Sequence, residues 1–425
     1  MPAPVRVPKI FKMSTITRRR VATRSILATV TLAGLALSGC ARLFPRPAPP
    51  PPPPAPEPAV PEGALPPSDT GPPPPSGPLP PDKPGVARGV VTEAEKPEWM
   101  RGLVMPDLPL RWYPKVTRFL ELYRSDPRYR EIMKGWLRRL PVYRATIEAA
   151  LAREGLPTGL VFVAMIESGF TSSALSNKGA GGFWQFLAGI GRGYGLEVSF
   201  WVDERRDLEK SSAAAALYLG DLYARFGSWE LALAGYNAGF YAVLTSIQRF
   251  NTNDFYSLSM LESGLPWETT EYVPKIFAAA IVERNRAVFG FADVVPDPPR
   301  DLEPVTAPPG ASFEAIARRL GMTEDEVALF NATYLRRRTP PDRPAVVLQV
   351  PRGKAKSLDG LKPGDLSPVK LRPGETLARL AKVHKVPRER LRRINGVSDE
   401  SEVLPGTTLL IPRATRPAPK PKAGT

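Results

Sequence analysis

The sequence predicts a mainly α-helical domain followed by two small α+β modules. Between residues 112 and 286, apolar residues recur with the three- and four-residue spacing of buried helix faces. After a proline-rich joint at 297–309, the pattern changes to a short strand, two short helices and another short strand. The chain also holds 52 prolines in 425 residues, which cluster and predict long linkers beside the folded parts.

The composition limits the chemistry that the chain can perform. Its formal net charge of +16 favours an anionic partner such as nucleic acid, a lipid surface or an acidic polymer. Because Cys40 is the only cysteine and His384 the only histidine, an internal disulfide and a zinc site of clustered cysteines and histidines are excluded. We expect His384 on the surface of a C-terminal module, away from the other motifs. A reaction would therefore depend on carboxylate, serine, lysine or tyrosine groups.

The first 40 residues predict a lipoprotein signal peptide. Arginines at 18–20 precede an apolar run at 26–37, which leads into Leu-Ser-Gly-Cys. A basic segment, a short apolar core and small residues before a cleavage site are typical of a secretory signal, and the run is short for a transmembrane helix. The last four residues resemble the lipobox of bacterial lipoproteins, so we expect Cys40 to be acylated; an uncleaved anchor is the alternative. Because Ala41 follows, the resemblance implies an exported lipoprotein in the outer membrane, facing the periplasm.

Residues 41–90 predict a disordered tether, and 414–425 a disordered tail. Proline dominates from Pro45 to Pro84, together with alanine, glycine and serine. Such a composition favours polyproline II and cannot bury a core. At ~3.1 Å per residue this segment reaches at most about 120 Å, which would let an anchored domain search the layer beyond the membrane.

The region 95–154 predicts amphipathic helices that pack on the domain after it. Two apolar stripes have helical spacing: Val116, Phe119, Leu120 and Leu122, then Ile132, Trp136, Leu137 and Leu140. Pro127 and Pro141 are expected to interrupt the helices. A further helix is then predicted at 143–153, ending at Gly155.

A single carboxyl group, Glu167, lies at the end of an apolar run at 161–170. The run predicts a buried helix, with Pro157 in its first turn and Gly169 at its end. Burial and the negative end of the helix dipole both disfavour the carboxylate, so the pKa of Glu167 should rise. A carboxyl that keeps its proton near neutral pH is suited to general acid catalysis, whereas the alternative is a structural glutamate paired with an arginine.

Three motifs follow one another in and after the apolar run at 161–170. They are Glu-Ser at 167–168, Gly-Ala-Gly-Gly-Phe-Trp-Gln-Phe at 179–186 and Gly-Tyr-Asn-Ala-Gly at 235–239. In the segment 179–186, glycines would let the backbone approach a ligand closely, and an aromatic side chain beside an amide suits sugar binding. The alternative for the same residues is a tight turn followed by core aromatics. Together the motifs resemble the family-1 lytic transglycosylases, goose-type-lysozyme-like enzymes that cut peptidoglycan glycan strands. Trp-Glu-Thr-Thr-Glu-Tyr-Val-Pro at 267–274 resembles their membrane-bound D-type branch.

The resemblance implies a lysozyme-like helical fold for a catalytic domain at 155–295, with Glu167 as the only acid and base. Glu167 would protonate the glycosidic oxygen, and the substrate's N-acetyl group would stabilise the oxocarbenium-like centre. The resulting carboxylate would then deprotonate the C6 hydroxyl, which leaves a 1,6-anhydromuramoyl end without a metal or cofactor. The sequence offers no convincing second carboxylate, and a reaction in which water is not the acceptor does not need one.

The resemblance also implies five substrate-binding residues: Ser168, Gln185, Tyr236, Asn237 and Glu268. Ser168 would orient the acetamido group or the acid, and Gln185 would line the cleft near the scissile sugar. Tyr236 would point its hydroxyl toward Glu167. The charged run Asp-Glu-Arg-Arg-Asp at 203–207 instead predicts a structural ion-pair network.

The C-terminal residues resemble LysM modules, which are glycan-binding βααβ folds. Residues 368–413 contain Arg-Pro-Gly-Glu-Thr-Leu at 372–377, Leu-Arg-Arg-Ile-Asn at 391–395 and an apolar run before Pro412. Residues 304–352 repeat the plan loosely. There the usual Gly-Asp-Thr-Leu becomes Gly-Ala-Ser-Phe at 310–313, so we expect weaker sugar binding by this divergent module.

Three functions compete on the sequence alone. A lytic transglycosylase acting on peptidoglycan glycan strands is favoured, because Glu167, Gln185 and the Tyr-Asn pair at 236–237 are all present. A non-catalytic peptidoglycan-binding lipoprotein that retains a lysozyme-like domain is the alternative. A nucleic-acid binder is indicated only by the positive charge, and no recognition motif accompanies it, so no nucleic-acid partner is expected.

Overall fold

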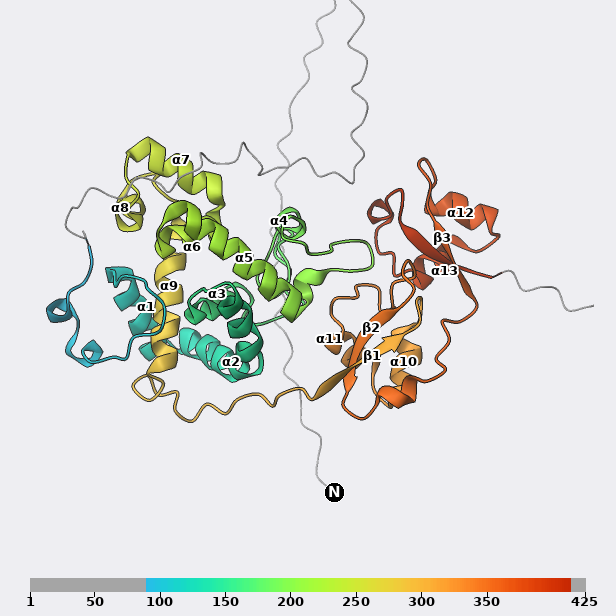
Figure 1. Ribbon diagram of the computed structural model, residues 1–425, viewed down its shortest axis with the longest axis horizontal. Coiled ribbons are helices and arrows are strands. Elements are labelled where there is room, and N and C mark those ends of the chain that lie inside the picture. The colour runs from blue at the N-terminus through green and yellow to red at the C-terminus, as the bar shows by residue number, and fades with distance from the viewer. Residues whose placement is uncertain (1–88, 414–425) are drawn as a thin grey trace, which may run out of the picture. The chain divides into compact units, whose positions relative to one another are not determined.

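A computed structural model describes residues 89–413 of the chain. The predicted signal peptide with Cys40, most of the tether and the C-terminal tail lie outside the described residues. Helices dominate the N-terminal part and two small strand pairs occupy the C-terminal part (Figure 1), so the predicted fold class is confirmed. Within 89–413, no helix combines the length and the apolar character needed to cross a membrane.

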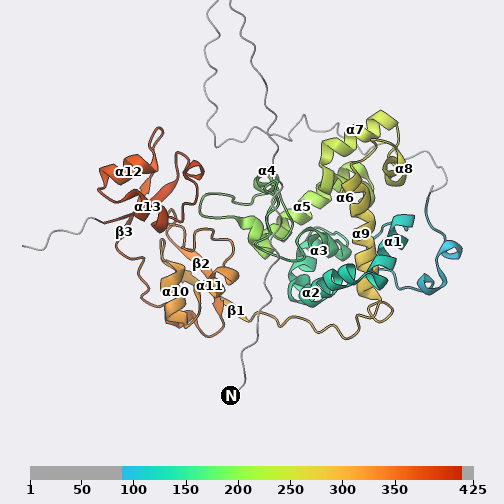
Figure 2. The same ribbon diagram turned by 180° about the vertical axis from the view of Figure 1, so that it is seen from behind.

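The helical part consists of α1 (Pro114–Ser125), α2 (Pro127–Arg153), α3 (Val161–Ser168), α4 (Ala188–Gly193), α5 (Leu208–Phe226), α6 (Trp229–Ala238), α7 (Phe240–Phe250), α8 (Phe255–Met260) and α9 (Trp267–Arg284). Helix α1 packs against α9, and α2 packs against α5 and α3 (Figure 1, and from behind in Figure 2). The predicted lead-in region therefore shares its core with the predicted catalytic domain.

Helix α2 corrects the prediction at its prolines. Pro127 begins the helix, where its missing N–H costs nothing, and the side chain of Asp126 caps the backbone N–H of Arg128 at 2.9 Å. Pro141 lies inside one continuous helix, although a proline there costs ~3 kcal/mol because a backbone hydrogen bond is lost. Tertiary packing outweighs this local preference, since seven side chains of α2 are buried.

The apolar stripe on α2 is also shifted by one residue from the prediction. Ile132 is 48% exposed, whereas the neighbouring Met133 is fully buried. Trp136, Leu137 and Leu140 are buried as predicted. Neighbouring residues of a helix are only 100° apart, so Ile132 and Met133 both fit the apolar spacing of the stripe. Which of the two is buried depends on the helix that packs against α2.

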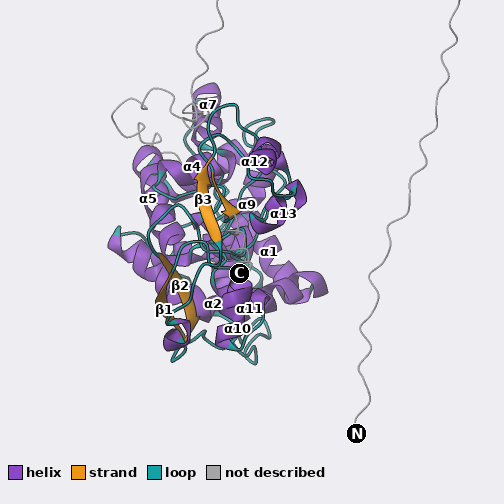
Figure 3. Ribbon diagram, turned by 90° about the vertical axis from the view of Figure 1, so that its right-hand side faces the viewer, coloured by secondary structure: helices purple, strands orange, loops and turns teal. Residues whose placement is uncertain are grey.

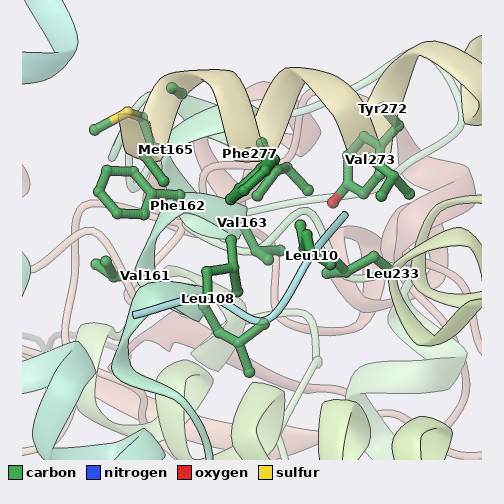
Figure 4. Packing of buried hydrophobic residues seen from close by; sticks show 14 of the residues in the cluster. Leu108, Leu110, Val161, Phe162, Val163, Met165, Leu233, Tyr272, Val273 and Phe277 are labelled. Atoms are coloured by element: carbon green, nitrogen blue, oxygen red, sulfur yellow. The ribbon is translucent and has the colours of Figure 1, made fainter. Parts of the chain in front are cut away.

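The first five residues of α3 are buried, as the sequence predicts, and its last three, including Glu167, are half-buried. Val161 to Met165 are 0–3% exposed. Figure 4 shows Phe162 and Val163 of α3 in the same core as Val273 and Phe277 of α9. Gly169 ends the helix with a left-handed backbone (φ 57°), and a Cβ there would lie 2.7 Å from the indole nitrogen of Trp136. Only glycine fits this stop, so the position of Glu167 two residues earlier is fixed.

Each C-terminal module has the predicted strand–helix–helix–strand order. The first consists of β1 (Leu302–Ala307), α10 (Phe313–Leu320), α11 (Glu324–Phe330) and β2 (Val346–Pro351). The second consists of β3 (Leu366–Lys370), α12 (Leu377–Val383), α13 (Arg388–Ile394) and β4 (Thr408–Pro412). Both strand pairs are antiparallel and appear in orange in Figure 3.

A buried asparagine after the second helix holds each module together. The side chain of Asn331 donates to the carbonyl of Gln349 at 2.9 Å and accepts from its N–H at 2.8 Å. Asn395 makes the same pair of bonds to Leu410, at 2.9 and 2.7 Å. The identical network supports the internal repeat that the sequence predicts. The predicted surface position of His384, directly after α12, is confirmed.

The segment 198–203 of the helical part contacts both modules. The indole nitrogen of Trp201 donates to the carbonyl of Thr408 at 2.7 Å, and Trp201 is 1% exposed. The backbone N–H of Asp203 donates to the carbonyl of Thr333 at 2.9 Å. The modules are thus bonded to the loop that also carries the ion-pair network of 203–207.

Candidate active site

Glu167 lies at the end of α3 and faces α9. Its Oε1 accepts a hydrogen bond of 2.6 Å from the hydroxyl of Tyr272. Burial raises the pKa of Glu167 to about 7; the Tyr272 hydrogen bond and the charge of Lys275 lower it, and the charge of Glu268 raises it. Among residues 89–413 no arginine pairs with Glu167, so the structural ion pair that the sequence left open is not formed.

Two cavities meet at Glu167. The larger, of about 570 Å³, is lined by residues from 176–190, by Tyr218 of α5, by 236–242 and by Glu268. The smaller, of about 330 Å³, extends along α1, α2 and α9. Glu167, Asn237 and Glu268 line both cavities. The carboxyl group can therefore reach a long ligand that passes from one cavity into the other.

Four of the predicted substrate-binding residues line these cavities: Gln185, Tyr236, Asn237 and Glu268. Gln185 has a left-handed backbone (φ 50°), and its amide donates to the carbonyls of Gly182 at 2.9 Å and Ala174 at 3.3 Å. These bonds hold the side chain and leave its oxygen available to a hydroxyl or acetamido group in the cavity. Asn237 is oriented by Thr269, whose hydroxyl donates to its oxygen at 2.7 Å.

Ser168 lines neither cavity. Its hydroxyl donates to the carbonyl of Phe183 at 2.7 Å and accepts from the N–H of Thr171 at 3.2 Å. The side chain therefore ties the end of α3 to the glycine-rich segment 179–186. It affects Glu167 by fixing the helix end, and its hydroxyl has no direct contact with the carboxyl group among the described residues.

Tyr236 differs from what the resemblance implied. Its hydroxyl donates to the carbonyl of Trp184 at 2.7 Å, and among the described residues it makes no hydrogen bond to Glu167, although both side chains line the larger cavity. The phenol that contacts Glu167 is Tyr272, which was not among the predicted site residues. The only signal for Tyr272 was its place in the motif at 267–274, because the motif does not say which face of α9 meets α3.

The ion-pair network of 203–207 supports the wall of the larger cavity. Arg205 pairs with Asp203 at 2.8 Å, and both side chains are buried. The same guanidinium donates to the carbonyls of Gly179 at 2.7 Å and Phe186 at 2.8 Å, which are the two ends of the glycine-rich motif. A Cβ on Gly182 would lie 1.8 Å from the carbonyl oxygen of Arg205, so the motif needs glycine to pack here. The predicted structural role of this network is confirmed.

Comparison with known proteins gives three domain matches. Residues 144–258 match the transglycosylase SLT domain, 301–363 the LysM-like domain of lytic transglycosylase MltD, and 369–412 the LysM domain. The chain is 28% identical over 320 residues to membrane-bound lytic murein transglycosylase D of Escherichia coli (strain K12). The matched region covers 70% of this chain and 69% of the relative.

Two solved structures resemble parts of the chain. One is an inactive mutant of lytic transglycosylase Slt from Pseudomonas aeruginosa, with 24% identity, a TM-score of 0.29, and coverage of 36% of this chain and 25% of that chain. The other is the 70 kDa soluble lytic transglycosylase SLT70 from Escherichia coli, with 18% identity, a TM-score of 0.32, and coverage of 40% and 33%. The domain matches and the relative confirm the resemblance seen in the motifs: a transglycosylase SLT domain is followed by an MltD LysM-like domain and a LysM domain, as in the lytic transglycosylases that the chain resembles.

Proposed function

We propose that this chain cleaves the β-1,4 bond between N-acetylmuramic acid and N-acetylglucosamine in peptidoglycan, with Glu167 as the single general acid and base. The observation that carries the proposal is a half-buried carboxyl group, where two cavities meet, whose pKa is raised to about 7 by desolvation. At neutral pH such a group is present in both protonation states, which a residue acting first as acid and then as base requires.

The first half of the reaction uses the protonated form. Glu167 donates its proton to the glycosidic oxygen, and the bond from that oxygen to C1 of the muramoyl sugar breaks. The N-acetyl group of the same sugar stabilises the electron-poor C1. Gln185 and Asn237 face the same cavity and would hold the sugar hydroxyl and acetamido groups in place.

The second half uses the carboxylate. Glu167 takes the proton from the C6 hydroxyl while that oxygen attacks C1, which forms the 1,6-anhydro ring and returns the enzyme to its starting state. The Tyr272 hydroxyl, 2.6 Å away, donates to the carboxylate, and a hydrogen bond to a charged acceptor is stronger than a neutral one.

Hydrolysis is the second candidate function. Glu268 lines both cavities together with Glu167, so a second carboxylate does reach the site. A water-activating base would give reducing ends instead of anhydro ends. The exposed position of Glu268 favours a role in substrate binding over a role as a tuned base.

We further propose that the chain is an exported lipoprotein, anchored to outer-membrane lipid by acylated Cys40 and facing the periplasm. The N-terminal sequence pattern supports this proposal, and the related Escherichia coli protein is named as membrane-bound. The C-terminal modules would hold the glycan strands close to the cavities; residues 369–412 contain nine lysines and arginines against five acidic residues, which suits an anionic wall.

Digestion of purified sacculi with wild type and with Glu167→Gln tests the proposal. The amide is isosteric, so the fold should persist, whereas proton transfer should be abolished. Circular dichroism of both proteins provides the control for folding. Cleavage by the variant near the wild-type rate would remove Glu167 from this role, and an inactive wild type would favour the non-catalytic peptidoglycan-binding alternative.

A further inference from the structure

Lys275 lies in the smaller cavity and has no role in the reaction described so far. It follows Tyr272 by one turn of α9 and lines the cavity together with Glu167 and Tyr272. The side chain is half-buried, and the described residues give its ammonium group neither a hydrogen bond nor an ion pair. A half-buried ammonium group that makes no hydrogen bond and no ion pair is costly, so its presence here calls for an explanation.

The other basic side chains near this cavity are already paired. Arg118, which also lines it, bonds to Glu271 at 3.1 Å. Lys115 bonds to the same carboxylate at 2.9 Å and to the hydroxyl of Thr270 at 2.7 Å. Among the residues that the structure describes, Lys275 is therefore the cation lining this cavity that forms no ion pair.

The groups that face Glu167 from the surrounding helices are mostly uncharged. Tyr236 of α6, Tyr218 of α5 and Tyr129 of α2 line the two cavities as phenols. From α9 come Tyr272, Glu268 and Lys275. Burial lowers the pKa of Lys275, and the charges of Glu167 and Glu268, which line the same cavity, oppose that effect.

We propose that Lys275 is a positioning residue that stabilises the carboxylate form of Glu167, and this role rests on the proposed function of Glu167 as acid and base. While Glu167 is protonated, its carboxyl group is neutral. When the proton has gone to the glycosidic oxygen, a negative charge appears at a desolvated place, and Lys275 provides the opposite charge. The lysine touches neither the glycosidic bond nor the C6 hydroxyl in this account.

A direct titration of Glu167 tests the proposal without requiring turnover. The full chain is labelled with glutamate carrying ¹³C at the carboxyl carbon, and the signal of Glu167 is assigned by its loss in Glu167→Gln. In Lys275→Met the pKa of Glu167 should rise from about 7 to about 8. The reason is that an opposite charge nearby lowers the pKa of a carboxyl group, and the variant removes that charge. Lys275→Arg keeps the charge and should keep the value near that of wild type.

Two matched variants sharpen the titration. Lys178→Met removes the same charge from an exposed position on the larger cavity and should leave the pKa of Glu167 unchanged. Glu268→Gln removes a negative charge and should lower the pKa of Glu167, the opposite direction from Lys275→Met. An unchanged pKa of Glu167 in a folded Lys275→Met protein would overturn the proposal.

A kinetic measurement separates this role from substrate binding. If Lys275 stabilises the carboxylate, Lys275→Met should lower kcat on sacculi, leave KM near wild type and move the basic limb of the pH profile upward. An increase in KM confined to strands with peptide stems, with the pKa of Glu167 unmoved, would instead assign Lys275 to a carboxylate of the substrate. A shifted pKa in a protein that cleaves nothing would reject the proposed function and leave the lysine's role intact.

Discussion

The hydroxyl of Tyr272 donates a 2.6 Å hydrogen bond to Oε1 of Glu167, across a separation of 105 residues in the chain. The bond joins the end of α3 to α9 and fixes one oxygen of the carboxyl group. Burial raises the pKa of Glu167 to about 7 even though this bond lowers it. The site thus combines a desolvated acid with one donor that favours its ionised form.

Tyr272→Phe should weaken catalysis by removing that donor. A hydrogen bond to a charged group contributes ~1.5–3 kcal/mol, which corresponds to roughly a 10- to 100-fold loss of kcat. Because the bond lowers the pKa of Glu167, its loss should also move the basic limb of the pH profile upward. The matched control is Tyr236→Phe, which removes a hydroxyl bonded to Trp184 and should leave that limb in place. Equal pH profiles for Tyr272→Phe and wild type would contradict the assignment.

Glu167→Gln should make the protein more stable at alkaline pH. The pKa of Glu167 rises from 4.5 to about 7 on folding, so between these values the unfolded state binds fewer protons and stability falls as pH rises. Above pH 7 the native state pays about 3 kcal/mol for the buried carboxylate. The glutamine carries no such charge.

Denaturant unfolding at two pH values checks this prediction. At pH 8 the variant should exceed wild type in free energy of unfolding by a few kcal/mol, whereas at pH 4 the carboxyl group is mostly protonated in both states and the two proteins should nearly agree. A constant difference at both pH values would show that the pKa of Glu167 is not raised in the folded protein.

The second LysM module should account for most of the binding to sacculi. Deletion of 369–412 should weaken sacculus binding and slow digestion, because a linked binding module raises the local substrate concentration. Cleavage of short soluble glycan fragments should persist in a chain that ends near Val295. Deletion of 304–351 should matter less, since this module lacks the usual Gly-Asp-Thr-Leu pattern. The opposite ranking in a sacculus pull-down would show that the divergent module is the binder.

This deletion needs a control for the contact with the helical part. Trp201 is buried and donates to the carbonyl of Thr408, so removing the second module also exposes its indole ring. Trp201→Ser in the intact chain removes the contact and keeps the module. If this variant loses as much sacculus binding as the deletion, the contact itself is what matters.

Cys40→Ala tests the proposed anchor. A chain that cannot be acylated at this position should be recovered uncleaved or in the soluble fraction after cell lysis. The catalytic residues are unchanged, so the soluble protein should still digest sacculi. Fractionation of the variant with the outer membrane, at the level of wild type, would contradict the lipobox assignment.

Much of the fold could be predicted because its signals are local. The end of α3 at Gly169 depends on a left-handed backbone that glycine adopts freely. The two C-terminal modules are predicted by their turn residues and short apolar runs. Pro141 shows where such reasoning fails. A proline usually breaks a helix, yet α2 continues through it because its packing against α5 and α3 outweighs the local cost.

The site could be predicted in part. Glu167 and Gln185 stand in motifs whose chemistry can be read from residue types, and both line the larger cavity. The partner of Glu167 could not be chosen in this way, because Tyr236 and Tyr272 are both phenols in motifs and only the crossing of α3 and α9 selects Tyr272. Among the described residues Lys275 forms no ion pair, whereas Arg118 in the same cavity pairs with Glu271. The sequence does not show which of these two cations is paired.

Mass spectrometry of the products released from sacculi tests the central claim most directly. If Glu167 acts alone as acid and then base, the muramoyl ends should be 1,6-anhydro ends, and none of the new ends should carry an oxygen atom from water when digestion is performed in H₂¹⁸O. Reducing muramoyl ends that contain ¹⁸O would contradict the account, because they would show that water is the acceptor and that a second carboxylate, with Glu268 as the first candidate, serves as the base.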